Sequence, residues 1–307
     1  MKRDFQRYLR AKRTVDDRAL DRRLVDDLRA ESAARADDSD GPLTVLEVGA
    51  GIGTMIARFV EWDILPPGEI RYTAIDLQPK NITELPRYLG TWAADRSITV
   101  EHGDRLTLAG PDRRIEVEAT VAEAVEYTER TETEYDLLVG AALLDILDLS
   151  KLESLIGTLG TGGLYYFPIT FDGGTRFLPT DPADRSIERQ YHSHMDAKEG
   201  GSSRAGAETL ARLQRLPGCS VDAAGSDWIV TPEDGSYPGD EAYFLRHILT
   251  TIEEAVTEIA PGAVDQLDEW LTRRRAQVAA GELTYLTHQL DLFGRVGDPV
   301  AIGADQG

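Results

Sequence analysis

The 307-residue sequence has one cysteine, few lysines and no long apolar run. The single cysteine, Cys219, excludes an internal disulfide and a zinc site built from cysteines, and it is usual for a reducing cytoplasm. No stretch approaches the roughly 20 apolar residues that a membrane-spanning helix needs. Residues 1–13 are basic but lack the apolar core of a signal peptide. We therefore expect a cytoplasmic protein without a membrane partner.

Positive charge is also scarce, since 33 basic residues face 54 acidic ones and the formal net charge is −21. Only 5 of the basic residues are lysines. This excess of carboxylates disfavours a sequence-independent hold on phosphates, so we expect no nucleic-acid partner. The composition resembles that of haloarchaeal proteins, in which concentrated salt screens charge repulsion. An ordinary acidic enzyme is the alternative.

The segment 44–54 is typical of a buried strand, a glycine turn and the start of a helix. Gly49, Gly51 and Gly53 alternate after the strand, and glycine lets a backbone turn tightly and approach a ligand closely. Glu47 is unusual in this segment, because the negative charge of a carboxylate would repel a pyrophosphate. The segment therefore favours a ligand with a cationic end.

Strand-like and helix-like segments alternate from 43 to 168, which predicts an α/β fold with a parallel sheet and helices on both faces. Alternation of period two around turn residues predicts a β-hairpin inserted at about 97–112. Near the end of the chain, two helical stripes predict a helix pair at 238–281. This pair would separate a sixth strand at 220–231 from a seventh at 283–293.

Three segments lie outside this pattern. An apolar stripe predicts one amphipathic helix at about 15–35, within an N-terminal extension of residues 1–40. This helix either caps the active site or packs on the sheet. The stretch 170–206, rich in Gly, Asp, Ser and Pro, is long enough to form a lid or a disordered loop. We divide the chain into the extension, a domain at 41–293 and a tail at 294–307.

Asp76, at the end of the second expected strand, adds specificity to the glycine turn. An acid at this position binds ribose hydroxyls, in NAD sites among others. The spacing here is Gly-x-Gly-x-Gly rather than the Gly-x-Gly-x-x-Gly of dinucleotide sites. Glu47 in addition suits the ammonium and sulfonium groups of S-adenosylmethionine. An NAD-dependent oxidoreductase is therefore disfavoured.

Segments 45–54 and 74–76 resemble the first two motifs of class I S-adenosylmethionine-dependent methyltransferases, a Rossmann-like family. Segments 135–139 and 159–164 resemble the family's strand 4 motif and the approach to strand 5. The resemblance covers about 43–168 and implies a doubly wound seven-stranded sheet with a reversed last strand. It implies that S-adenosylmethionine is the cofactor and that its contacts come from Glu47, Gly49, Ala50, Gly51, Gly53, Asp76, Leu77, Ala122, Glu123 and Gly140.

The region after the third strand departs from the family pattern, in which an acid often holds the adenine amine. Glu123 is the nearest acid, and Asp104 competes with it. The stretch 140–146 is apolar except for Asp145, and it lacks the Asn-Pro-Pro-Tyr signature that follows strand 4 in enzymes acting on adenine or glutamine amides. This favours a small-molecule acceptor.

The segment 191–196 holds another concentration of reactive groups. His192, His194 and Asp196 alternate, so on an extended segment they share one face. They could be metal ligands, a base with its orienting carboxylate, or part of a solvated loop. We predict no metal and assign His194 and His192 as catalytic residues. The residues expected on the acceptor side are Tyr165, Asp172, Asp145 and Asp196.

The resulting hypothesis is methyl transfer from S-adenosylmethionine to a small-molecule acceptor, by an enzyme that mainly supplies proximity and alignment. One alternative is a catalytically inactive cofactor-binding or regulatory protein. Another is a protein or RNA methyltransferase, against which the acidic charge weighs in the case of RNA. A homodimer is left open as the assembly.

Overall fold

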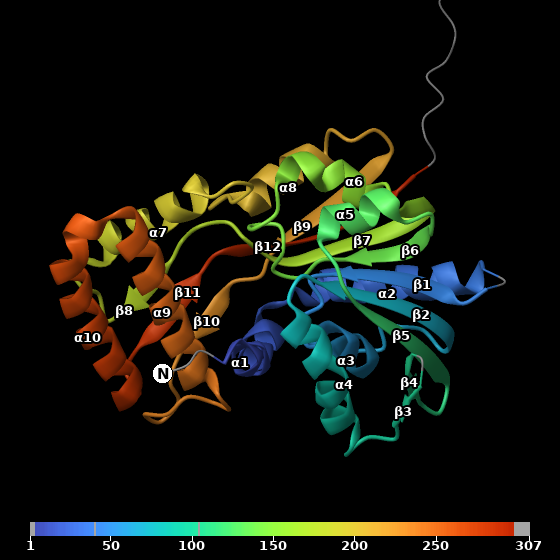
Figure 1. Cartoon of the computed structure of the whole chain (residues 1–307), viewed down its shortest axis with the longest axis horizontal. Coiled ribbons are helices and arrows are strands. Elements are labelled where there is room, and N and C mark those ends of the chain that lie inside the picture. Colours follow the sequence, from blue (N-terminus) through green and yellow to red (C-terminus); the bar gives the residue numbers. More distant parts are fainter. Residues whose placement is uncertain (1–3, 40, 104, 298–307) are drawn as a thin grey trace, which may run out of the picture.

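The computed structural model describes residues 4–39, 41–103 and 105–297, which form two β-sheets flanked by helices (Figure 1). The larger sheet is mixed. Within these residues its nine strands are, in spatial order, β3 (Thr99–His102), β4 (Leu106–Ala109), β5 (Arg113–Val121), β2 (Gly68–Asp76), β1 (Leu43–Val48), β6 (Tyr135–Val139), β7 (Leu159–Phe171), β12 (Gln289–Val296) and β9 (Cys219–Gly225).

Five adjacent strands, from β5 to β7, run parallel, whereas β12 runs antiparallel to both of its neighbours. The α/β prediction is therefore confirmed. The prediction of seven strands is wrong, because the hairpin expected at 97–112 does not stand apart from the sheet. Its second strand, β4, pairs antiparallel with β5, so the hairpin extends the sheet edge by two strands.

Helices cover both faces of this sheet, as buried parallel strands require. On one face lie α2 (Arg22–Asp37), α3 (Thr54–Glu61) and α4 (Pro79–Ala93), whose apolar side chains form one core with the strands. On the other face lie α5 (Ala124–Arg130), the short η1 (Leu149–Lys151), α6 (Leu152–Ile156) and α8 (Ala205–Leu213), around a second core.

The smaller sheet is antiparallel, and it comprises β10 (Trp228–Val230), β11 (Thr284–Thr287) and β8 (Arg176–Leu178) in that order. The late strands predicted at 220–231 and 283–293 are thus each broken in two. One half of each, β9 or β12, stays in the large sheet, and the other half joins the small one. The breaks are fixed by backbone hydrogen bonds from Ser226 N to Gln289 O, at 2.9 Å, and from His288 N to Gly173 O, at 3.0 Å.

The first break falls at Gly225-Ser226-Asp227, a run of turn-forming residues that was the available signal, whereas no glycine or proline marks the second break at His288. The last strand also extends to Val296, beyond the expected limit of 293. Most of the predicted tail, residues 298–307, lies outside the described residues.

Three helices pack with the small sheet at one end of the molecule, on the left of Figure 1. They are α7 (Asp184–Ala197), α9 (Glu241–Ile259) and α10 (Val264–Ala280), with the short η2 (Pro261–Ala263) between the last two. The predicted helix pair at 238–281 is therefore present. The loop expected at 170–206 is not a loop, because it contains β8, α7 and the start of α8. Its central helix is held by Trp270, whose Nε1 donates to Asp184 Oδ1 at 2.8 Å.

The N-terminal extension also differs from the prediction. Two helices, α1 (Phe5–Ala19) and α2, replace the single helix expected at 15–35. The chain turns at Leu20, and the Asp21 carboxylate caps α2 by accepting from Leu24 N at 2.9 Å. The apolar stripe is carried from one helix into the next, which is why periodicity alone suggested one helix.

A buried carboxylate joins the second of these helices to the sheet. Asp291 in β12 is fully buried, and its oxygens accept from Asp21 N at 2.9 Å and from Ile169 N at 2.8 Å. Ile169 has a positive φ of 59°, a strained conformation for a β-branched residue. Asp291 therefore holds both the entry to α2 and the bend at the end of β7.

Asp291→Ala is expected to lower the free energy of unfolding by about 3 kcal/mol, since two inward-facing N–H groups lose their acceptor. Urea denaturation of the variant and the wild type measures this difference. Asp222→Ala is the matched control, because Asp222 is exposed on the neighbouring strand β9. If the two substitutions lower the free energy of unfolding equally, the buried hydrogen bonds of Asp291 do not stabilise the fold more than an exposed carboxylate does.

Within the described residues, none of the helices combines the length and the apolar composition needed to cross a bilayer.

Candidate functional site

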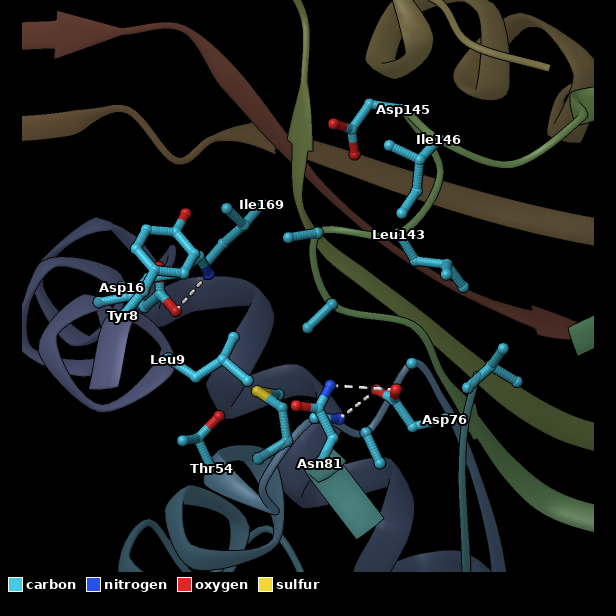
Figure 2. A pocket seen from close by; sticks show the side chains of 18 of the residues that line it. Tyr8, Leu9, Asp16, Thr54, Asp76, Asn81, Leu143, Asp145, Ile146 and Ile169 are labelled. Carbon is cyan, nitrogen blue, oxygen red and sulfur yellow. Dashed lines mark hydrogen bonds and ion pairs between the residues drawn. The ribbon is translucent and has the colours of Figure 1, made fainter. Parts of the chain in front are cut away.

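A cavity of about 560 Å³ lies at the carboxyl ends of β1, β2, β6 and β7 (Figure 2). Connections from β1 lead to β2 on one side, whereas β6 lies on the other side of β1. Ligands of open α/β sheets bind where the strand order reverses in this way. The walls also include residues from α1, α3, α7, α9 and the small sheet. The cavity therefore lies between the large sheet and the small sheet with its helices.

The glycine turn forms one wall of this cavity. Gly49, Gly51 and Gly53 have positive φ angles of 72°, 57° and 85°, which residues with a Cβ rarely adopt. A Cβ on Gly51 would lie 3.2 Å from Leu9 Cδ1, and one on Gly53 would lie 3.1 Å from Leu85 Cγ. The alternating glycines are therefore required by the backbone and by close packing above and below the turn.

Asp76 organises the turn from the end of β2 and is only 8% exposed. Its Oδ2 accepts from Gly51 N at 2.8 Å, while Oδ1 accepts from Gln78 N at 2.7 Å and from Asn81 Nδ2 at 3.0 Å (Figure 2). A carboxylate can accept about four hydrogen bonds. Asp76 thus keeps capacity for a ligand hydroxyl while it fixes the turn.

Glu47 lies beneath the turn and is 1% exposed. The Tyr72 hydroxyl donates to its Oε2 at 2.7 Å. Burial raises the pKa of Glu47 to about 8, against the opposing effects of the Tyr72 hydrogen bond and the Arg58 charge. The carboxyl group is therefore mostly protonated at neutral pH, and an approaching cation would favour its ionised form.

Arg58, from α3, is the cationic group of this part of the cavity and is 1% exposed. Its Nε donates to Asp17 at 2.6 Å, whereas Nη2 makes no hydrogen bond within the described part of the chain and lies 3.9 Å from Asp16 Oδ2. Asp16 is engaged elsewhere, with Lys12 Nζ at 2.6 Å and Trp228 Nε1 at 3.0 Å. Arg58 therefore presents a buried donor that lacks an acceptor.

Helix α1 closes the cavity over the turn. Leu9 contacts Gly51, and Gln6 Nε2 donates to Asn81 Oδ1 at 2.9 Å, which links the helix to the partner of Asp76. The helix predicted at 15–35 corresponds mainly to α2, which packs on the large sheet, whereas the helix at the cavity is α1, most of which precedes that range. Sequence reasoning placed no site residue in this helix, although the spacing of Phe5, Tyr8, Leu9, Lys12 and Asp16 follows one helical face and was the available signal.

Most of the predicted cofactor residues meet at this cavity, namely Glu47, Gly49, Ala50, Gly51, Asp76, Leu77, Ala122 and Glu123. Glu123 also caps α5 by accepting from Glu126 N at 2.7 Å. Gly53 and Gly140 are not in its lining. Gly53 begins α3, and Gly140 follows β6, where a Cβ would lie 3.0 Å from Leu143 Cδ2. Asp104, the competing acid, lies outside the described residues.

The prediction that His192, His194 and Asp196 share one face of an extended segment is wrong. They lie on helix α7, where residues two apart point about 200° apart. His192 Nε2 is hydrogen-bonded to Thr175 Oγ1 at 3.0 Å, and His194 Nε2 to Glu258 Oε2 at 2.9 Å. Neither histidine lines the cavity, whereas Tyr191 and Met195 of the same helix do.

Three of the four residues expected on the acceptor side also have structural partners away from the cavity. Tyr165 donates to Ser220 O at 2.5 Å, Asp172 accepts from Ala207 N at 3.0 Å, and Asp196 accepts from Ser203 N at 2.7 Å. The fourth, Asp145, lines the cavity. No group of three or more potential metal ligands occurs among the residues that the structure describes.

Asp145 stands in the loop after β6, and Figure 2 shows its carboxylate directed from that loop towards the open centre of the cavity. Its Oδ1 is buried and has no hydrogen-bond partner in the described chain. Burial raises the pKa of Asp145 to about 6, while its own backbone N–H and Lys12 act in the opposite direction. Leu143 of the same loop would be 3.2 Å from a Cβ on Gly49, so the loop touches the glycine turn.

No protein-family model and no curated protein matches the chain. Among solved structures, the chain is similar to a SAM-dependent methyltransferase from Geobacter sulfurreducens in complex with S-adenosyl-L-homocysteine. The identity is 15%, the likeness covers 91% of this chain and 92% of that chain, and the TM-score is 0.42. It is also similar to the plantazolicin methyltransferase BpumL in complex with SAH, at 12% identity, 94% and 90% coverage and a TM-score of 0.40. Both likenesses are remote, so the chemistry of the cavity is the basis for assigning a function.

Proposed function

We propose that this chain binds S-adenosylmethionine in the cavity and transfers its methyl group to a small molecule. One observation carries the proposal: a buried carboxyl group, Glu47, and a buried guanidinium, Arg58, line the cavity, and Arg58 Nη2 has no hydrogen-bond acceptor among the described residues. Arg58 is close enough to Glu47 to oppose the effect of burial on its pKa. An amino acid group carries an ammonium and a carboxylate together, and this pair of side chains complements both.

The remaining walls fit the rest of the cofactor. Asp76 has acceptor capacity left for ribose hydroxyls. Leu77, Ala122 and Glu123 form the adjoining wall for the adenine ring. S-adenosylmethionine supplies an electrophilic methyl group on a sulfonium, so the chain itself has to align the acceptor and exclude water. Helix α1 lies over the turn and excludes water from the cavity.

A small acceptor is favoured over a protein or an RNA because α1, α7 and α9 all contribute to the walls of the cavity. A folded macromolecule could not bring its reactive atom past these helices without moving them. The net charge of −21 weighs further against RNA. A cofactor-binding protein without catalytic activity is the second candidate. Asp145 disfavours it, because Oδ1 of this carboxylate in the cavity has no hydrogen-bond partner among the described residues.

Isothermal titration calorimetry in concentrated salt tests the proposal. We expect S-adenosylhomocysteine to bind at a single site at least about tenfold more tightly than NAD. The reason is that Glu47, beneath the turn, would be placed against the pyrophosphate of NAD but against the amino group of S-adenosylhomocysteine. Tight binding of NAD with no response to S-adenosylhomocysteine would refute the methyltransferase assignment.

A further inference from the structure

Beyond the glycine turn, the cavity continues into a compartment with aromatic walls. Its rings come from Tyr8 of α1, Phe171 of β7, Tyr191 of α7, Trp228 of β10 and Tyr285 of β11. These five elements come from both sheets and from two helices, so the compartment exists only in the assembled fold. A flat apolar or aromatic ligand fits walls of this kind.

Asp145 is a carboxylate of this compartment whose charge Lys12 offsets only from a distance. The cations that line the cavity are engaged elsewhere, Lys12 with Asp16 at 2.6 Å and Arg58 with Asp17 at 2.6 Å. His247 of α9 stacks on the Tyr8 ring at 3.9 Å between centroids. Oδ1 of Asp145 is buried, and no donor in the described residues forms a hydrogen bond with it. A buried carboxylate of this kind requires a donor, and the bound molecule is the donor that the fold leaves room for.

The other titratable groups around Asp145 agree with this requirement. Burial raises the pKa of Tyr8 and of Tyr191, and the charge of Asp145 raises both further, so the two phenols face the carboxylate and stay neutral. Gln289, 1% exposed in the cavity wall, offers a second buried acceptor, because its Oε1 also lacks a hydrogen bond in the described chain. Neutral rings around a carboxylate with one oxygen that no described residue satisfies favour a cation, which ring faces also attract.

We propose that the methyl acceptor is an amine on an aromatic or apolar body, with its nitrogen bound by Asp145 and its body packed against the tyrosine rings. This inference rests on the proposed methyltransferase function. An ammonium offers up to three N–H donors and a positive charge, which match the two buried acceptors, Asp145 Oδ1 and Gln289 Oε1, and the negative charge of Asp145. A carboxylate or phosphate ligand would add a negative charge beside Asp145. A phenol has only one donor and no charge to neutralise it.

The reaction balances with Asp145 as the proton acceptor. Its carboxylate takes one proton from the bound ammonium, whose pKa the apolar walls lower. The freed lone pair on nitrogen forms a bond to the methyl carbon of the sulfonium donor, while the carbon–sulfur bond breaks and its electron pair stays on sulfur. The products are a methylated ammonium and a neutral thioether, and the proton on Asp145 passes to water.

Calorimetry with two probes of equal shape tests the inference. Protein saturated with S-adenosylhomocysteine is titrated with 2-phenylethylamine and with the neutral 2-phenylethanol at about pH 8, where the amine is charged and a carboxyl group with a pKa of about 6 is ionised. We expect the amine to bind at least about tenfold more tightly than the alcohol. Equal binding of the two probes would overturn the inference without any variant.

Asp145→Asn should lower the affinity for the amine about tenfold and change that for the alcohol by less than about twofold, since only the charge is removed. Asp95→Asn, in an exposed turn after α4, is the matched control and should change neither. If the Asp145→Asn variant still binds the amine about tenfold more tightly than the alcohol, Asp145 does not bind the amine nitrogen and the proposed acceptor site is refuted. The affinity for S-adenosylhomocysteine is measured separately, so failure of the proposed cofactor is seen independently of failure at Asp145.

Discussion

Asp76→Ala is expected to lower the affinity for S-adenosylhomocysteine about 100-fold or more. The substitution removes the acceptor for ribose hydroxyls, and hydrogen bonds to a charged group contribute about 1.5–3 kcal/mol. It also releases Gly51 N and Asn81 Nδ2, which Asp76 holds at 2.8 Å and 3.0 Å. The glycine turn then loses part of its ordered geometry before the ligand arrives, and ordering it again reduces the binding free energy.

Calorimetry with S-adenosylhomocysteine measures this effect, and Asp95→Asn again serves as the control at an exposed position. Asn81→Ala separates the two contributions, since it disturbs the support of Asp76 but leaves the carboxylate in place. We expect Asn81→Ala to reduce the affinity by less than Asp76→Ala. An Asp76→Ala variant that is folded and binds with unchanged affinity would remove Asp76 from the cofactor site.

The second large effect is a loss of stability with rising pH, caused by Glu47. Burial raises its pKa from 4.5 to about 8, so the folded protein binds this proton more tightly than the unfolded chain does. The contribution to stability is fully present below about pH 4.5 and is lost as the pH rises through 8. At its limit the loss is on the order of 5 kcal/mol, because each unit of pKa corresponds to about 1.4 kcal/mol.

Glu47→Gln should abolish this part of the pH dependence, since an amide keeps the shape but has no proton to lose. Relative to the wild type, the variant should be several kcal/mol more stable at about pH 9 than at about pH 5. Urea denaturation at both pH values gives the two free energies of unfolding. Glu69→Gln is the matched control, because Glu69 is exposed at the start of β2. The idea fails if Glu47→Gln retains the same pH dependence as the wild type.

The cofactor side of the cavity could be predicted because its signals are local. A glycine that needs positive φ, an acid that ends a strand and a carboxyl before the turn are each properties of a few consecutive residues. In a parallel sheet the ends of neighbouring strands meet at one edge, so 47–53, 76–77 and 122–123 come together once the strand order is known. Gly53 and Gly140 follow the same pattern but are used for packing.

The prediction of an extended segment at 191–196 was wrong for a reason that was also local. Glycine and proline clusters on both sides of 184–197 suggested a loop, and alternation then suggested an extended segment. Ile187, Tyr191 and Met195 recur at intervals of four, which is a helical period, and the structure has a helix there. That helix turns Tyr191 and Met195 towards the cavity, while the histidines lie elsewhere.

The sequence by itself determined the α/β class, the glycine turn and the acids beside it, because these depend on backbone conformation and on the ends of strands. Only the tertiary structure decided which residues enclose the aromatic compartment. Tyr8, Asp145, Tyr191 and Tyr285 are separated by up to 277 positions and come from two helices, one strand and one loop. No periodicity links such residues, since their proximity follows from how α1, α7 and the small sheet pack against the large one, and packing of this kind depends on the whole chain.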